Sequence, residues 1–322
     1  MSQNMPDISV VVCAYTEERW DDLATAVASL QSQTLAPKEI IVVIDHNPRL
    51  FARARQEIDG AAVIENSQQR GLSGARNTGI AAAAGSIIAF LDEDAMAMPD
   101  WLALLGASYA DPRVLGVGGA IVPMWLSGRP GWFPEEFDWV VGCVYRGMPE
   151  SAAPVRNLIG CNMSFRREVF DEIGGFRNGI GRIGTRPVGC EETELCIRAR
   201  QRWPRSQLIY QPRAKVYHRV PASRSRWSYF RSRCYAEGLS KALVSRLVGP
   251  QDGLASERSY VAHTLPRGVG KGLADALLRG DPAGLARAGA IAGGLALTAL
   301  GYLIGLKERP SAAGSAYSPA GA

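Results

Sequence analysis

The chain has 322 residues, of which 47% are hydrophobic and 21% are charged, so it can bury the core of one large domain or of two smaller ones. Its 36 basic and 31 acidic residues leave a formal net charge of +5, which suits nucleotide phosphates or an anionic membrane surface as well as simple solubility. The basic residues do not gather in one early stretch and no nucleic-acid-binding motif occurs, so we expect no nucleic-acid partner.

The first hundred residues alternate between short apolar runs and segments with helical spacing. The apolar runs predict strands over residues 8–15, 38–47, 61–66 and 87–91. The segments between them predict helices over residues 21–33, 50–59 and 74–84. Apolar strands that alternate with helices are typical of a parallel sheet with helices on both faces. We therefore expect an α/β, Rossmann-like domain with a mostly parallel central sheet, which binds its ligand at the carboxyl ends of the strands.

The rest of the chain is less regular. Further strands are predicted over 114–125 and 208–220, and a basic, aromatic helix is predicted over 224–246. Residues 288–306 carry no charge, and their length is near the minimum for crossing a bilayer, roughly 20 residues. This segment fits either of two alternatives, a membrane-associated helix or a buried core helix.

The composition indicates three regions. We expect a catalytic domain over residues 1–240, a C-terminal helical and membrane-associated region over 241–310, and a disordered, low-complexity tail over 311–322. The six cysteines show no CxxC pair and no zinc spacing, so we expect buried, reduced thiols in a cytosolic protein. The first residues lead directly into a strand, so no signal peptide is expected.

Three consecutive acids, Asp92, Glu93 and Asp94, follow the last apolar run of this first part. Like charges at such short range repel one another, so a cation usually accompanies them. Asp92 and Asp94 flank one residue at the end of a strand and can reach one point beyond it. Two hard oxygen ligands there suit Mg²⁺ or Mn²⁺, which would bridge a diphosphate. The structural alternative is that Asp94 or Asp100 caps the next helix.

Other polar residues end neighbouring strands or begin helices. The turn Gly-Leu-Ser-Gly begins a helix that carries Arg76, and free backbone NH groups with an arginine fork suit phosphate. Glu17 and Asp45 close two adjacent strands, where their carboxylates could accept hydrogen bonds from a base edge or from ribose hydroxyls. An ordinary glycine-rich turn and two helix caps are the alternatives.

Six segments follow one another along the chain: ISVVVCAYTEERWDDLATAVASLQSQT, EIIVVIDHN, GLSGARNTGI, FLDEDA, NMSFRREVFDEIGGF and GCEETELCIRARQ. Together they resemble the family 2 glycosyltransferases of the GT-A fold, over roughly residues 8–240. The resemblance implies a cytoplasmic, inverting enzyme that moves one sugar from a nucleoside-diphospho sugar to a glycan or polyprenyl-linked acceptor at the inner membrane surface.

The resemblance also implies roles for individual residues. The donor site would contain residues from the ends of the strands and from the Arg76 segment: Ala14, Tyr15, Glu17, Asp45, Arg76, Asp92 and Glu93. The divalent cation, Mn²⁺ or Mg²⁺, would be held by Asp94 and Asp92, with His218 completing the shell. His218 as an ordinary structural histidine is the alternative.

The segment Cys-Glu-Glu-Thr matches the family's acidic pair at the start of the acceptor helix. Glu192 is therefore expected to be the general base, with Glu191 in second place. Asn162, Trp132 and Arg233 are the expected acceptor-binding residues. The QxxRW pattern of processive polymer synthases is absent from the sequence, which favours a single transfer.

Two other functions remain possible at this point. A nucleotidyltransferase that makes sugar nucleotides shares the alternating sheet and the acidic metal site, but it should carry a glycine-rich loop where this chain has Ala-Tyr-Thr-Glu-Glu. A non-catalytic sugar-binding relative would be expected to lose the acids at the metal or base positions, and both sets are present here.

Overall fold

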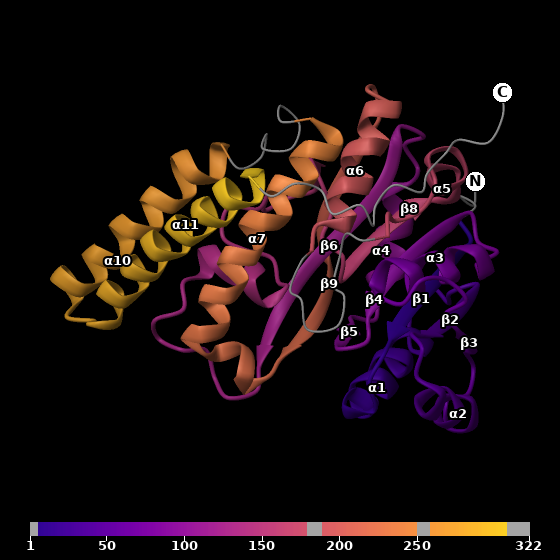
Figure 1. Cartoon of the computed structure of the whole chain (residues 1–322). Helices are drawn as coiled ribbons and strands as arrows, with labels where there is room; N and C mark the ends of the chain where they lie inside the picture. The colour runs from indigo at the N-terminus through magenta and orange to yellow at the C-terminus, as the bar shows by residue number, and fades with distance from the viewer. Residues whose placement is uncertain (1–5, 179–188, 250–257, 308–322) are drawn as a thin grey trace.

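Figure 1 shows a computed structural model of the chain, which describes residues 6–178, 189–249 and 258–307. Within these residues the core is one nine-stranded sheet in the order β3-β2-β1-β4-β8-β6-β9-β5, and β7 pairs with β9. Helices α7, α10 and α11 form a group of their own beside β6 and β9. The α/β fold class and the C-terminal helical segment are thus confirmed.

The amino-terminal half of the sheet is parallel, because β1 pairs with β2 and β4, and β2 pairs with β3. The strands are β1 (Ile8–Ala14), β2 (Glu39–Ile44), β3 (Ala62–Glu65) and β4 (Ile87–Asp92). The helices between them are α1 (Trp20–Gln31), α2 (Pro48–Glu57) and α3 (Leu72–Ala82). Each element predicted here is confirmed, with ends that differ by a few residues.

Alternate residues of these strands enter two separate cores. Val10 and Val42 belong to the core that contains residues of α1, α2 and α4 (Trp101–Ser108), whereas Val11 and Val43 belong to the core that contains residues of α3. All four valines are almost completely buried. Burial on both faces explains why the strands appear as continuous apolar runs in the sequence.

The other half of the sheet mixes directions. Its strands are β5 (Ala95–Ala97), β6 (Val114–Trp125), β7 (Ala153–Val155), β8 (Asn162–Arg166) and β9 (Gln207–Val220). β6 and β9 are parallel, whereas β8 is antiparallel to β4 and β6, and β5 and β7 are antiparallel to β9. β3, β2, β1, β4, β6 and β9 therefore share one direction, which confirms a mostly parallel sheet.

The remaining described elements connect the sheet or cover it. The short ones are η1 (Glu17–Arg19), η2 (Glu135–Val141), α5 (Arg167–Ile173) and η3 (Ala222–Ser225). The longer ones are α6 (Glu191–Arg202), α7 (Trp227–Val248), the π-helical turn η4 (Tyr260–Thr264), α10 (Leu265–Arg279) and α11 (Ala283–Lys307). All six cysteines are buried and free, as predicted.

The C-terminal helices are continuous with the catalytic part of the chain. The boundary expected at residue 240 lies inside α7, and the tail expected over 311–322 lies outside the described residues. By length and composition, α11 is the one helix among the described residues that could cross a membrane. One side of α11 nevertheless packs on α7 within this structure.

Glycines let α7 and α11 pack backbone against backbone. A methyl group added at Gly238 would lie 2.1 Å from the Thr298 carbonyl oxygen and 2.5 Å from the Tyr302 nitrogen. At Gly301 it would lie 2.1 Å from the Tyr235 carbonyl oxygen. Only glycine permits this approach, so these two positions fix how the helices cross.

We expect Gly238→Ala to lower the free energy of unfolding by about 1–3 kcal/mol, because overpacking pushes the two backbones apart. This cost exceeds the gain in helix propensity, about 1 kcal/mol, that alanine brings. The matched control is Gly289→Ala in α11, where a methyl group meets nothing within 4 Å, and it should be neutral or stabilising. Urea unfolding midpoints measure both, and equal midpoints for the two variants would contradict the prediction.

Candidate functional site

A cavity of about 670 Å³ opens where β1 and β4 end. Residues from the ends of these strands, from the first turns of α3 and α6, and from α7 and α11 line it. The predicted residues among them are Ala14, Tyr15, Asp45, Arg76, Asp92, Glu93, Asp94, Glu191, Glu192, His218 and Arg233. The fold thus brings together residues that lie more than two hundred positions apart in the sequence.

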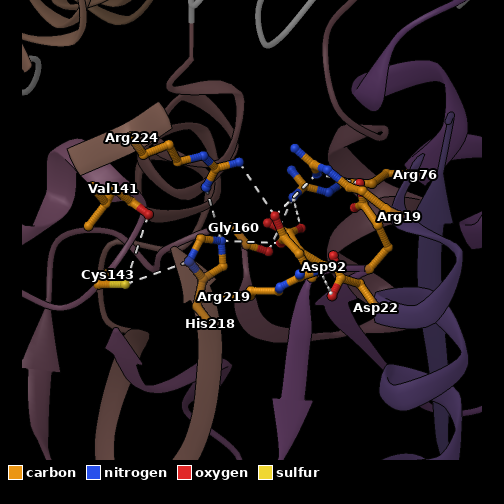
Figure 2. Close-up of polar contacts among 12 residues, drawn as sticks. Arg19, Asp22, Arg76, Asp92, Val141, Cys143, Gly160, His218, Arg219 and Arg224 are labelled. Atoms are coloured by element: carbon orange, nitrogen blue, oxygen red, sulfur yellow. Dashed lines mark hydrogen bonds and ion pairs between the residues drawn. The ribbon is translucent and has the colours of Figure 1, made fainter. Parts of the chain in front are cut away.

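Arg76 links two of the predicted acids. Its Nη1 atom lies 2.8 Å from Glu191 Oε1, and its Nη2 atom lies 3.3 Å from Asp92 Oδ1. Nη2 also donates to the Gly160 carbonyl oxygen at 3.2 Å, and Figure 2 shows Arg76 and Asp92 together. Buried charges are tolerated when they are paired, so Arg76 joins the acidic end of β4 to the start of α6.

Asp94 lies among three nitrogen-bearing side chains. Its Oδ1 atom is 3.2 Å from His218 Nε2, and its Oδ2 atom is 3.1 Å from Arg19 Nη1 and 3.4 Å from Arg224 Nη2. Burial alone would raise the pKa of Asp94, but His218, Arg224 and Arg19 hold it well below its ordinary value. Asp94 is therefore ionised across the physiological pH range.

His218 on strand β9 and Arg224 in the turn after it point toward each other (Figure 2), and both contact Asp94. His218 Nδ1 lies 3.7 Å from Cys143 Sγ, and its Nε2 lies 3.4 Å from Arg224 Nη1. Arg224 and Cys143 are not among the predicted residues. No motif marks them, because contact with His218 depends on the tertiary structure alone.

Glu93 pairs with Arg19, whose Nη1 atom also contacts Asp94. The distance from Arg19 Nη1 to Glu93 Oε1 is 2.6 Å. Burial, together with the neighbouring Asp94, raises the pKa of Glu93 to about 7. Arg19 therefore offsets part of the charge repulsion within the acidic triplet.

The two glutamates that begin α6 differ in their surroundings. Glu191 is 5% exposed and paired with Arg76, whereas Glu192 is half-buried and faces the cavity. Burial and the negative charge of Glu191 raise the pKa of Glu192 to about 8, although Arg76 opposes this effect. Of the pair, Glu192 has the properties of a proton acceptor that works near neutral pH.

Asp45 follows the end of β2 and also lines the cavity. Its Oδ1 atom accepts a hydrogen bond from Asn66 Nδ2 at 2.7 Å, and its Oδ2 atom accepts one from the Gly71 backbone nitrogen at 2.9 Å. Asp45 thus holds the turn before α3 close to the end of β2. Tyr15 is about half exposed next to it, which leaves its ring available to a bound planar group.

Three predicted residues do not line the cavity. Glu17 is exposed on η1. Trp132 packs on Phe133 and Trp227 within an aromatic cluster. Asn162 is fully buried, and its amide accepts from Trp101 Nε1 and donates to the carbonyl oxygens of residues 120 and 214. The acceptor role expected for Asn162 is corrected, because both polar atoms of its side chain bond to α4 and to the sheet.

Trp139 lines the cavity where Trp132 was expected. Its Nε1 atom donates to the Tyr260 hydroxyl at 3.1 Å, and that hydroxyl donates to the Glu136 carbonyl oxygen at 2.5 Å. Tyr229 and Tyr260 line the cavity as well. The three tryptophans of this region look equivalent in the sequence, so only the fold identifies the one at the site.

Two side chains on the cavity wall, Asp94 and His218, could provide ligands for a divalent cation. Among the described residues, no three His, Cys, Asp or Glu side chains converge in a ligand arrangement. Asp94 and His218, however, place a carboxylate oxygen and an imidazole nitrogen 3.2 Å apart on the cavity wall. Mg²⁺ and Mn²⁺ sites are commonly completed by substrate phosphates, so this pair fits such an ion bound together with a diphosphate.

Comparison with known proteins identifies the family of the chain. Residues 9–174 match the family described as Glycosyl transferase family 2. The glucosyl-dolichyl phosphate glucuronosyltransferase of Haloferax volcanii is 37% identical over 244 residues, which are 74% of this chain and 78% of that protein. Glycosyltransferase AglE of the same organism is 27% identical over 186 residues, 56% of this chain and 59% of that protein.

Solved structures show the same fold. The mannosyltransferase PcManGT from Pyrobaculum calidifontis, in complex with GDP-Man and Mn²⁺, aligns with a TM-score of 0.59 at 20% identity, covering 94% of this chain and 88% of its own. GalNAc-T7 with UDP, GalNAc and Mn²⁺ aligns with a TM-score of 0.53 at 18% identity, covering 78% of this chain. This chain spans about half of GalNAc-T7, 52%. The cavity, the GT-A fold and the sequence match agree, and the chain belongs to glycosyltransferase family 2.

Proposed function

We propose that the protein transfers one sugar, with inversion, from a nucleoside-diphospho sugar to a hydroxyl of a lipid-linked glycan. The observation that carries this proposal is the shared cavity of Asp94, His218 and Glu192. A donor diphosphate and an acceptor hydroxyl need opposite chemistry, a cation for the first and a base for the second. The cavity offers residues suited to both.

The donor would lie between the ends of β1 and β4. Asp45 and Tyr15 line the cavity and would contact the base and ribose, and Arg76, Arg19 and Asp92 would lie near the phosphates. Asp94 and His218 would hold a divalent ion, which when bound supplies positive charge to the departing diphosphate. Both related structures were solved with Mn²⁺, which supports a divalent cofactor.

The acceptor would approach from the side of α6. Glu192 would take the proton of the acceptor hydroxyl as that oxygen attacks the anomeric carbon. A single displacement, with base and leaving group on opposite sides, inverts the configuration at that carbon. Glu191, paired with Arg76, would keep the pKa of Glu192 raised and would not accept the proton itself.

The proposed acceptor class is based on the relative from Haloferax volcanii that is 37% identical over 74% of this chain. That protein is named for transfer of glucuronic acid to glucosyl-dolichyl phosphate. We infer that a sugar linked through phosphate to a polyprenyl chain is the acceptor here as well. The family assignment speaks against the nucleotidyltransferase, and the retained base and metal acids speak against a non-catalytic relative.

Thermal unfolding in the presence of UDP, GDP or dTDP, each with and without Mn²⁺, tests the donor half of this proposal. We expect one nucleotide to raise the melting temperature in a metal-dependent way. Mass spectrometry of a mixture with the corresponding nucleotide sugars and farnesyl-phosphate-linked glucose then tests transfer. A folded protein that none of the nucleotides stabilises, and that forms no product, would overturn the proposal.

The pH dependence distinguishes the two glutamates. Because Glu192 must be ionised to act as a base, kcat/KM should rise as the pH increases through about 8 and level off above it. Glu191→Gln removes a neighbouring negative charge, which lowers the pKa of Glu192, so we expect the midpoint to fall by about one pH unit. Glu168→Gln on exposed α5 is the control. An unchanged midpoint in Glu191→Gln would contradict this assignment.

A lipid-linked acceptor implies that the protein works at a membrane surface, on the cytoplasmic side. Leu277 and Leu278 at the end of α10 are 79% and 84% exposed, and Leu285 at the start of α11 is 55% exposed. They lie where α10 and α11 meet, at the end of the hairpin far from the sheet (Figure 1). Arg279 adjoins them, and basic residues beside exposed leucines favour an anionic bilayer surface.

We expect the double variant Leu277→Glu/Leu278→Glu to bind anionic vesicles at least about tenfold more weakly, because burial of each leucine contributes roughly 1.5–3 kcal/mol. Sedimentation with phosphatidylglycerol vesicles measures this. Gln56→Glu adds negative charge on exposed α2, on the other side of the molecule (Figure 1), and should have no comparable effect. Equal sedimentation of the two proteins would exclude the hairpin as the contact.

A further inference from the structure

One stripe of α7 faces the cavity beyond the acidic centre. Tyr229, Arg233, Glu237 and Lys241 all line it, and they lie on successive turns of one helix face. Two cations thus point into the same space as Glu192. The proposed transfer reaction does not use them so far.

The opposite wall of this part of the cavity comes from α11 and η4. Leu295, Ala299 and Tyr302 of α11 line it together with Tyr260 and Val261 of η4. The wall is apolar apart from two phenol hydroxyls and the hydroxyl of Thr298, which donates to the Gly294 carbonyl oxygen. Cations on one wall and apolar side chains on the other suit an amphipathic ligand that carries an anionic group.

The cationic stripe lies next to the start of α6. Lys241 Nζ is 3.2 Å from Glu237 Oε1, and Glu237 Oε1 is 3.6 Å from Cys190 Sγ. Ser240 Oγ also accepts a hydrogen bond from the Gly189 nitrogen at 3.1 Å. Cys190 immediately precedes the two glutamates of α6. An acceptor with its hydroxyl at Glu192 would therefore extend past this stripe.

We propose that Arg233 and Lys241 bind the phosphate of the acceptor, and that the space between α7, α11 and η4 holds its first prenyl units. This inference rests on the proposed function, because it takes the acceptor to be a phosphate-linked lipid. The stripe belongs to α7, whereas Asp45 and Asp94 follow the ends of β2 and β4, and Arg76 lies in α3. The phosphate bound there is thus the acceptor's, separate from the donor diphosphate.

The packing of α7 on α11 supports a preformed space. Gly238 and Gly301 bring the two helices into backbone contact, and Arg246 Nη2 donates to the Gly305 carbonyl oxygen at 2.6 Å. The helices therefore cannot collapse onto the cavity without losing these contacts. A prenyl chain would enter an existing opening at little cost in rearrangement.

Binding of farnesyl phosphate, measured by calorimetry on the full chain in detergent below its micelle concentration, tests the proposal without catalysis. We expect Arg233→Gln and Lys241→Gln each to weaken binding at least tenfold, and Arg233→Lys to retain part of the affinity. The control is Arg231→Gln, which lies exposed on the same helix and does not line the cavity. Melting temperatures confirm that each variant is folded.

Three competitors identify what is recognised. Farnesol should bind at least tenfold more weakly than farnesyl phosphate, inorganic phosphate should not displace it, and saturating UDP with Mn²⁺ should leave its affinity unchanged. No binding by the wild type, equal affinity in Arg233→Gln, or competition by UDP would each overturn the subsite. Farnesyl phosphate binding that depends on Arg233 in a protein with no transferase activity would instead overturn the proposed function.

Discussion

Replacement of Glu192 by glutamine should lower kcat about 10³-fold while the protein still binds its nucleotide sugar. General-base catalysis contributes roughly 10²–10⁴ to enzymatic rates, and Glu192 is the half-buried member of the glutamate pair that faces the cavity. Glutamine preserves the size of the side chain but cannot accept a proton. The loss should therefore appear in kcat, with the donor dissociation constant changed little.

Glu191→Gln is the informative partner of this variant. Glu191 is engaged by Arg76 at 2.8 Å, so its loss should reduce the rate far less than loss of Glu192 does. Single-turnover transfer, together with nucleotide-induced thermal stabilisation, separates catalysis from binding. If Glu191→Gln were the more damaging change, the base would be Glu191, and the assignment of the pair would have to be reversed.

The parallel half of the fold is predictable from sequence because its strands are buried on both faces. Their apolar runs are continuous, and helices of ten to twelve residues separate them. β5, β7 and β8 have five residues or fewer, which is too short to show a period. Unlike the equally short β3, they do not belong to a regular alternation of strands and helices. Their place in the sheet depends on pairing with β4, β6 and β9, which is a tertiary property.

Some residues of the candidate site are also predictable from the sequence, and others are not. Asp92, Asp94 and Glu192 are predictable because they follow strand ends or begin a helix that faces the sheet. The arginines that pair with these acids are not predictable from the sequence, because Arg19 and Arg224 reach Asp94 from η1 and η3. Nothing in their local sequence distinguishes them from surface arginines.

For Asn162, the sequence suggests a role at the site that the structure corrects. A polar residue beside the expected acceptor cleft suggests ligand binding, but strand β8 buries it between β4 and β6. There its amide satisfies the Trp101 indole and two carbonyl groups. Buried polar groups in a sheet need such partners, and sequence alone does not show which polar residue has that task.

Asp94→Asn should abolish metal-dependent stabilisation by the nucleotide and also destabilise the protein without ligand. Asparagine keeps the shape of the side chain but removes the charge that faces His218, Arg224 and Arg19. Removing one partner from a buried ionic cluster costs about 3–5 kcal/mol. Arg19 retains Glu93 as a partner, so we expect a loss near the lower end, about 3 kcal/mol.

The pH dependence of stability gives a second readout of the same carboxylate. The folded state depresses the pKa of Asp94, so its contribution is complete above the unfolded pKa, about 4, and is lost as the pH falls through the lower folded value. The difference in unfolding free energy between wild type and Asp94→Asn should therefore be constant at neutral pH and shrink in acid.

The control for both readouts is Asp100→Asn, an exposed carboxylate ahead of α4. It should leave the nucleotide effect and the unfolding midpoint unchanged. A nucleotide that stabilises Asp94→Asn with Mn²⁺ as strongly as it stabilises wild type would remove Asp94 from the metal site. An unchanged unfolding free energy would mean that the contacts of Asp94 with His218, Arg224 and Arg19 do not stabilise the fold. Water or another acid would then replace Asp94 as their partner.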